Sequence, residues 1–244
     1  MNGSLQTIPL ANLAIAFIPV AIVVTLLFRW ALDGRTAIYA VARMLLQLLL
    51  IGYALNWIFA GDSAVIISLL LAFMLAVASW IAMRPLKQNT GTAYARILTA
   101  IAIGGCGTLA LITTSVMEID PWYAPRQIIP LAGMIFANSM NAVSLAAERL
   151  DAELTQGMEL IEARNLAYQA ALIPMLNSLF AVGLVSLPGM MTGQILSGVE
   201  PLVAARYQIM VMCMLFGAAG ISAGIYLSLV VRHFETPVAK SDSG

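Results

Sequence analysis

The chain has 244 residues, of which 61% are hydrophobic and 10% charged, and its formal net charge at pH 7 is zero. Ordinary globular domains carry about 25% charged residues, so this composition excludes a soluble globular protein. The neutral balance, without a basic cluster among aromatic residues, excludes a nucleic-acid-binding protein. We therefore expect a protein whose solvent is the lipid bilayer.

Seven apolar segments follow one another along the chain, and each is long enough to cross a hydrocarbon core of roughly 30 Å as a helix. They are residues 10–28, 37–59, 64–83, 97–117, 128–147, 170–187 and 209–231. Their even apolarity favours helices over the tilted strands of a barrel. The sequence predicts an all-α, polytopic transmembrane helix bundle that forms a single domain over residues 1–244. No Lys or Arg precedes the first segment, so we expect it to be a retained span.

The positive charges predict the orientation of this bundle. With the N-terminus outside, nine of the twelve Lys and Arg residues fall in inner connections or the C-terminal tail, and only Arg126 and Arg206 fall outside. Because inner loops of membrane proteins are enriched in Lys and Arg, we expect the N-terminus outside and the C-terminus inside. The predicted location is the inner (plasma) membrane, crossed several times.

Arg43 is the one positive residue inside a predicted span. Its long side chain can reach back to the inner headgroups, which is one interpretation. Gln47 lies four residues on and shares its helix face, which favours a polar stripe facing the bundle interior or a substrate pathway. Both interpretations stay open at this point.

Two further polar patches lie within predicted spans. Asn138, Ser139 and Asn141 share the fifth span, and Asn177 and Ser178 share the sixth. Amide side chains commonly tie membrane helices together, at about 0.6 kcal/mol per contact, so interhelical hydrogen bonding is the simpler explanation. A lining for a polar substrate, with Asn138 and Asn141 on its pathway, is the alternative.

Residues 187–194 combine Pro188 with two glycines, the first of them Gly189, at membrane depth. Irregular backbone is tolerated there only inside protein or beside a cavity, so we expect a re-entrant segment or a hinge on the substrate pathway. Met190 and Met191 lie in this segment. Their thioethers are soft metal ligands, although methionine more often fills gaps in a core.

The sequence offers no catalytic or metal-binding constellation. Cys106 and Cys213 both lie inside apolar spans, and His233 is the only histidine. The only two lysines, Lys87 and Lys240, do not follow a glycine-rich loop, so the chain has no P-loop for ATP. We expect neither an enzyme nor a bound cofactor, and any ATP must be bound by a partner.

Residues 148–165 form the most highly charged stretch. Four apolar residues recur there at helical spacing, with acidic residues between them: Leu150, Leu154, Met158 and Ile161. The pattern predicts an amphipathic helix on the inner side. It is either a solvated extension of the fifth span or a surface that couples the chain to a cytoplasmic partner.

Several strings resemble the FetB-type iron-export permease family, over roughly residues 37–233. They are RMLLQLLLIGY from Arg43, QIIPLAGM from Gln127 with Asn138-Ser-Met140, ALIP from Ala171, VSLPGMMTG from Val185 and RYQIMV from Arg206. Plant relatives of this family are linked to aluminium tolerance. The resemblance implies the permease subunit of an ABC transporter, with a separate cytoplasmic ATPase that binds ATP, a homodimeric permease, and a role in iron homeostasis and resistance to oxidative stress.

The chain departs from this family at the connection between the fifth and sixth spans. Family members have a longer cytoplasmic segment there, with a Leu-Gly-Ala-Thr-like string that contacts the ATPase, and this string is missing here. Either residues 148–165 couple in shortened form, or the contact is lost, or the gene model is abbreviated. A stand-alone secondary transporter and a non-transporting membrane scaffold are the alternative functions, although the spans lack the carboxylate that a proton relay needs.

Overall fold

The computed structural model describes residues 8–60, 63–86 and 90–235, and within these ranges its regular elements are all helices. The chain divides into two compact units, Met1–Gly61 and Asp62–Gly244. In the described part of the chain, six helices are long and apolar enough to cross a membrane. The predicted all-α, polytopic class is confirmed, whereas the orientation and the single-domain organisation stay predictions.

The first unit consists of α1 (Leu10–Ile15), α2 (Ile18–Arg29) and α3 (Gly34–Ala60). Pro19 lies in the first turn of α2, where its missing N–H costs nothing, and separates α2 from α1. Asp33 begins α3, since its Oδ1 accepts a hydrogen bond from the Thr36 amide at 3.0 Å. Hydrogen bonds from the Thr36 hydroxyl and amide lower the pKa of the Asp33 carboxyl, which lies between the two spans.

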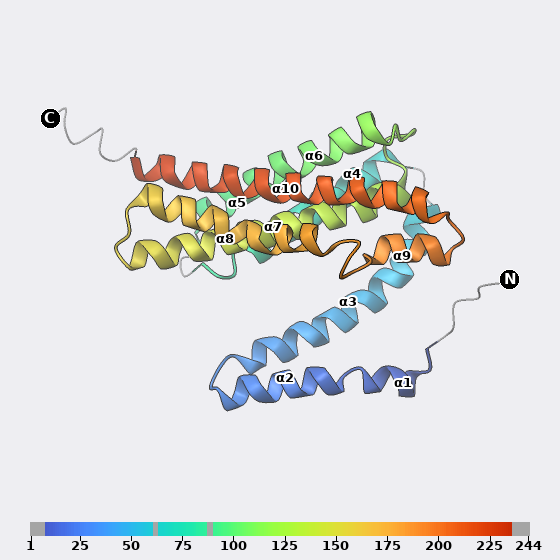
Figure 1. Ribbon diagram of the computed structural model, residues 1–244, viewed down its shortest axis with the longest axis horizontal. Helices are drawn as coiled ribbons and strands as arrows, with labels where there is room; N and C mark the ends of the chain where they lie inside the picture. The colour runs from blue at the N-terminus through green and yellow to red at the C-terminus, as the bar shows by residue number, and fades with distance from the viewer. Residues whose placement is uncertain (1–7, 61–62, 87–89, 236–244) are drawn as a thin grey trace. The chain divides into compact units, whose positions relative to one another are not determined.

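The second unit is a bundle built around α7 (Pro125–Thr155) and α10 (Pro201–Glu235), which pack against each other and against α8 (Leu160–Ala181). Figure 1 shows these three helices side by side. α4 (Ala64–Ala82) packs on α7, and the short α9 (Gly189–Leu196) packs on α10. The buried core between them is aliphatic, with Ile135, Val143 and Leu227 among its fully enclosed side chains.

The remaining span is one helical run from Gly91 to Val116 with two π-helical segments. It consists of α5 (Gly91–Ile101), η1 (Ala102–Cys106), α6 (Gly107–Leu111) and η2 (Ile112–Val116). Gly104, in η1, lies directly against Ser222 of α10. Helices approach this closely only where a residue lacks a side chain.

The Gly220-x-x-x-Gly224 motif in α10 marks a second close contact. A Cβ at Gly220 would lie 3.4 Å from the Tyr168 hydroxyl of α8, and one at Gly224 would lie 3.6 Å from the Tyr168 ring. The glycines therefore let α8 approach α10, as small residues four apart do in membrane helix pairs.

The sixth predicted span, 170–187, is wrong in both boundaries. The helix runs from Leu160 to Ala181, and it is not among the six that are long and apolar enough to cross. Polar residues in its first turns lower its hydropathy. At its other end the helix stops before Gly183, whose φ of +81° is a left-handed conformation that few residues other than glycine adopt. Pro188 follows and disfavours a helical conformation in the residue before it.

The single amphipathic helix predicted over 148–165 is also wrong. α7 ends at Thr155, and Gly157, with φ +86°, ends it in a Schellman motif in which the Met158 amide donates to the Glu153 carbonyl at 3.1 Å. The Glu159 carboxylate then caps α8, where it accepts from the Ile161 amide at 3.3 Å. The segment is a tight helical hairpin, because Gly157 permits a left-handed turn. The spacing of apolar residues does not reveal such a turn.

Candidate functional site

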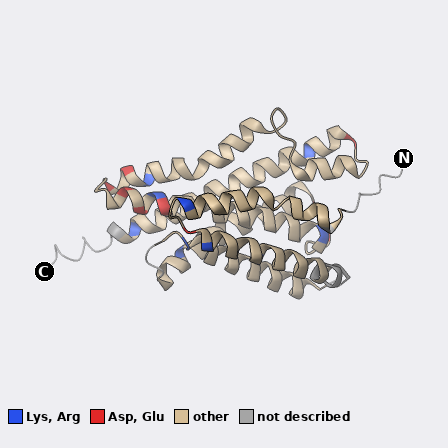
Figure 2. Ribbon diagram, turned by 90° about the horizontal axis from the view of Figure 1, so that it is seen from below, with Lys and Arg blue, Asp and Glu red and all other residues tan. Residues whose placement is uncertain are grey.

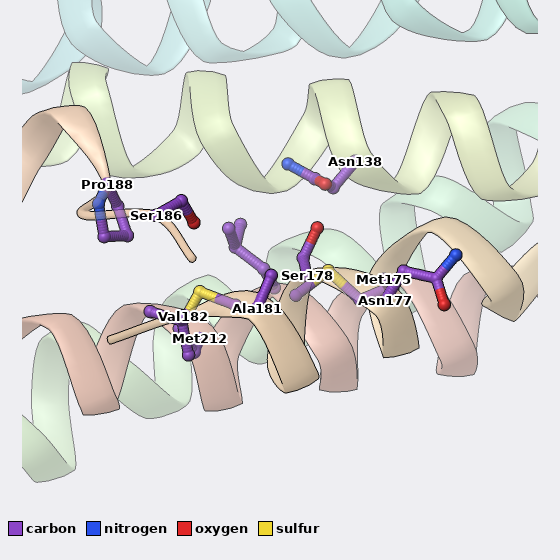
Figure 3. A pocket seen from close by; sticks show the side chains of 10 residues that line it. Asn138, Met175, Asn177, Ser178, Ala181, Val182, Ser186, Pro188 and Met212 are labelled. Atoms are coloured by element: carbon purple, nitrogen blue, oxygen red, sulfur yellow. The ribbon is translucent and has the colours of Figure 1, made fainter. Parts of the chain in front are cut away.

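A cavity of about 430 Å³ opens between α7, α8, the 182–188 connection and α10. Figure 3 shows the side chains that surround it. Its lining residues are Asn138, Met175, Asn177, Ser178, Ala181, Val182, Ser186, Pro188, Met212 and Leu215. The lining is mostly apolar with a few polar groups, which is the usual character of a small-molecule site.

The polar groups of this cavity keep acceptor oxygens available. Asn138 donates one amide N–H to the Met134 carbonyl at 2.9 Å, so its side-chain oxygen is not used by that bond. Ser178 donates its only proton to the Pro174 carbonyl at 3.0 Å, so its oxygen can still accept. Figure 3 shows the Ser178 hydroxyl pointing toward Asn138, whereas the amide of Asn177 points away.

A smaller cavity of about 90 Å³ adjoins the first, and Asn138, Met175 and Ser178 line both. Asn141 lines the smaller one, together with Leu145, one turn further along α7. The structure thus brings the two predicted polar patches together from α7 and α8. Ser139, by contrast, is fully buried on another face of α7 and faces no cavity that is described here.

The backbone between α8 and α9 is irregular and borders the cavity. The Gly183 amide donates to the Ser186 carbonyl at 2.9 Å, and the Val185 amide donates to the Ala181 carbonyl at 2.8 Å. The irregular segment is therefore 182–188, not 187–194 as predicted, since Gly189 already begins α9. Pro188, which is the N-cap residue of α9, also lines the cavity. Helices broken in this way typically lie at substrate sites of transporters.

The other pathway candidates are not among the residues that line this cavity. Gly189 and Met191 lie in α9 without lining it, and Met190 lines a third cavity nearer the start of α7. Arg43 and Gln47 lie on one face of α3 in the first unit. With the Gln47 oxygen turned toward Arg43, it accepts from Nε at 3.0 Å and Nη2 at 3.3 Å, so their shared face is confirmed and their role stays a prediction.

Three of the four predicted coupling residues face the core of their own chain. Leu150 is 3% exposed, and Leu154 and Met158 are partly buried against the core cluster. Ile161 is 37% exposed and is the member of the stripe that a partner can reach most easily. Aspartate at Leu154 or Met158 would therefore disturb the hairpin itself.

Acidic residues surround this hairpin. Figure 2 shows most of the Asp and Glu residues toward the end of the bundle where α7 passes into α8. They are Glu148, Asp151, Glu153, Glu159 and Glu162. Glu153 is 4% exposed and pairs with Arg149, one turn earlier. The hairpin tip therefore offers an acidic surface with one exposed isoleucine.

Sequence reasoning missed Met175, Met212 and Ser186, which line the cavity. The chain has fourteen methionines, and nothing in the sequence distinguishes Met175 and Met212 from the others, because methionine also fills gaps in cores. Among the described residues, no group of three or more His, Cys, Asp or Glu is placed to hold a metal ion.

Six helices, among the described residues, that are long and apolar enough to cross a membrane define the class of multi-pass integral membrane proteins. Within it, residues 10–234 match the family described as "Uncharacterised protein family (UPF0014)", so the chain belongs to that family. No solved structure shows a significant match.

Three relatives cover most of the chain. It is 35% identical to the "Probable iron export permease protein FetB" of Escherichia coli, over 96% of this chain and 94% of that protein. It is 32% identical to "Protein ALUMINUM SENSITIVE 3" of Arabidopsis thaliana, over 86% of this chain and 81% of that protein. It is 33% identical to "UPF0014 membrane protein STAR2" of Oryza sativa subsp. japonica, over 86% of this chain and 77% of that protein. The predicted resemblance to the FetB-type family is confirmed.

The alignment with the Escherichia coli protein spans 249 positions, more than the 244 residues of this chain, so it contains gaps in this chain. The loss of the cytoplasmic segment that family members have between the fifth and sixth spans stays a prediction. The sequence places that loss where Glu162–Ala167 runs directly into Tyr168–Pro174, within α8.

Proposed function

We propose that this chain is the permease subunit of an ABC-type transporter of the inner membrane, which exports iron or a metal-related solute. A separate cytoplasmic ATPase binds the ATP, and two copies of the permease work together. The observation that carries the proposal is the similarity, along nearly the whole chain, to a protein named as a probable iron export permease.

The position of the cavity supports a transport role. Along α7, Asn138 lies about 20 Å from Pro125 and about 26 Å from Thr155, at 1.5 Å per residue. With α7 crossing the bilayer over its predicted span, 128–147, Asn138 and the cavity lie close to the midplane, where transporters place their substrate sites. The break at 182–188 gives α8 and α9 a joint about which one can move relative to the other.

Coupling to the ATPase is assigned to the α7–α8 hairpin. The chain has no P-loop, so the energy of ATP has to arrive through a surface on the inner side. The exposed face of Ile161, with Glu159 and Glu162 beside it, offers an apolar contact within an acidic rim. A partner with a basic groove matches this surface.

The proposal is tested by purifying the tagged chain from its own membrane and identifying its partners by mass spectrometry. We expect a nucleotide-binding protein in near-stoichiometric amount, and a higher iron content in cells that lack the chain than in cells that have it. Absence of a nucleotide-binding partner would favour a secondary transporter or a scaffold. Equal iron content in the two strains would contradict iron export.

A further inference from the structure

A third cavity, of about 260 Å³, lies between the first turns of α7 and helices α9 and α10. Its lining residues are Met117, Arg126, Gln127, Pro130, Leu131, Met134, Met190, Gln194 and Tyr207. On the predicted topology this cavity lies at the outer end of the bundle. It contains Met190, which the sequence analysis placed on the pathway, but no residue of the first two cavities.

All three cavities lie on one face of α7. Gln127 and Met134 line the third cavity, Asn138 the first and second, and Asn141 and Leu145 the second. These positions are separated by seven, four, three and four residues, so they form one stripe along the helix. From Asn141 to Arg126, which lines the third cavity in the turn where the stripe begins, the distance along α7 is about 22 Å, most of the way from the midplane to the outer surface.

The cavities are also neighbours in space. The Met134 carbonyl, on the third cavity, accepts the hydrogen bond from Asn138, on the first. α9 lines the third cavity with Met190 and Gln194, and the 182–188 connection before it lines the first. A movement of the broken helix would therefore act on both cavities at once.

The charge of this track is the informative feature. Among the residues that line the three cavities, all within the described part of the chain, Arg126 is the only charged one. The other polar groups are amides, hydroxyls and a phenol. Cation pathways are typically lined by Asp or Glu, and pathways for anions by Arg or Lys. The positive end of the α7 dipole lies in the same turn as Arg126 and adds to the same potential.

We infer that the solute moves along this face of α7 as a neutral or anionic complex, in which the solute's own carboxylate ligands cancel the charge of the metal, and that Arg126 binds it at the outer mouth. The inference rests on the proposed transport function and on the predicted orientation. Buried Gln194 Oε1, which has no hydrogen-bond partner among the described residues, can accept from a hydroxyl of such a ligand. An inside-negative membrane opposes export of a cation by about 2.3 kcal/mol per charge at 100 mV and favours export of an anion.

The test uses the purified full chain in detergent and measures equilibrium binding of three probes. They are ferric citrate carrying labels on both the iron and the citrate, citrate alone, and ferrous iron without a chelator under anaerobic conditions. We expect ferric citrate to bind with both labels in a fixed ratio. Loss of a charge-assisted hydrogen bond predicts that Arg126→Gln weakens this binding about tenfold and that Arg126→Lys retains part of it.

Arg206→Gln is the matched control, because Arg206 is the other outer arginine and does not line the cavity. It should leave binding unchanged. Iron binding without citrate, tighter binding of ferrous iron, or equal effects of the two arginine variants would overturn the inference. If the chelate binds as expected but no ATPase accompanies the chain, the proposed function fails and the inference on the form of the solute stands. If an ATPase drives export of bare iron, the inference alone fails.

Discussion

Replacing Gly104 with alanine should weaken the packing of the fourth span on α10. The new Cβ would lie 2.4 Å from the Ser222 hydroxyl oxygen, 2.8 Å from the Ser222 amide nitrogen and 3.0 Å from its Cα. A side chain can rotate away, but the nitrogen and Cα belong to the α10 backbone. The helix itself would have to recede by roughly 0.6 Å or more to restore an ordinary contact.

The magnitude follows from two opposing effects. Overpacking a tight interior costs about 1–3 kcal/mol, and a backbone clash belongs at the upper end of that range. The helix propensity of alanine over glycine returns up to about 1 kcal/mol. We therefore expect a net loss of about 1–2 kcal/mol, which lowers the melting temperature by about 2–8 °C for a chain of this length.

Gly107→Ala is the matched control, because it lies in the same span and no atom lies within 4 Å of a Cβ placed there. It should be neutral or slightly stabilising. Ser222→Ala removes a buried hydroxyl that has no partner in the described part of the chain, so alone it should cost little, and combined with Gly104→Ala it should restore only part of the loss. The assay is thermal unfolding of the purified protein in detergent. Equal melting temperatures for Gly104→Ala and Gly107→Ala would refute the close approach.

Three further predictions concern topology, the cavity and the hairpin. In a cysteine-free background, a cysteine at Tyr123 should react with an impermeant thiol reagent from outside and one at Thr90 should not, because the positive charges place them on opposite sides; the reverse labelling would invert the topology. Asn138→Leu should lower the export rate about tenfold through loss of a hydrogen-bonding group, whereas Ser139→Ala, on another face of α7 away from the described cavities, should change it little; equal rates in the two variants would remove the cavity from the pathway. Ile161→Asp should abolish co-purification of the ATPase while melting temperature and membrane insertion stay at parental values, and retained co-purification would remove the hairpin from the coupling surface.

The bundle could be predicted from the sequence because the cost of polar groups in lipid is large and continuous over about 20 residues. The same cost made Asn138, Asn141 and Ser178 recognisable as candidates, and the structure places all three on adjoining cavities. Helix ends were predicted less well. Gly157 and Gly183 end α7 and α8 through single left-handed backbone conformations, which an average over an apolar window does not register.

The periodicity at the hairpin was interpreted correctly as an apolar stripe. The sequence did not show which surface covers this stripe. Leu150 and Leu154 pack into the bundle of their own chain, because α7 continues beyond its predicted end at residue 147. An amphipathic pattern shows that a face is covered and leaves open what covers it. Met175 and Met212 stayed hidden for a related reason, since a methionine that lines a cavity and one that fills a core look alike in sequence.

We propose that ATP hydrolysis by a partner moves an iron solute through this chain. The most direct measurement is uptake of radiolabelled ferric citrate into inside-out membrane vesicles that contain the chain and its co-purified ATPase. We expect uptake that requires ATP hydrolysis and falls about tenfold with Asn138→Leu. Uptake at the same rate without ATP, or at the parental rate in vesicles that lack the chain, would contradict the account.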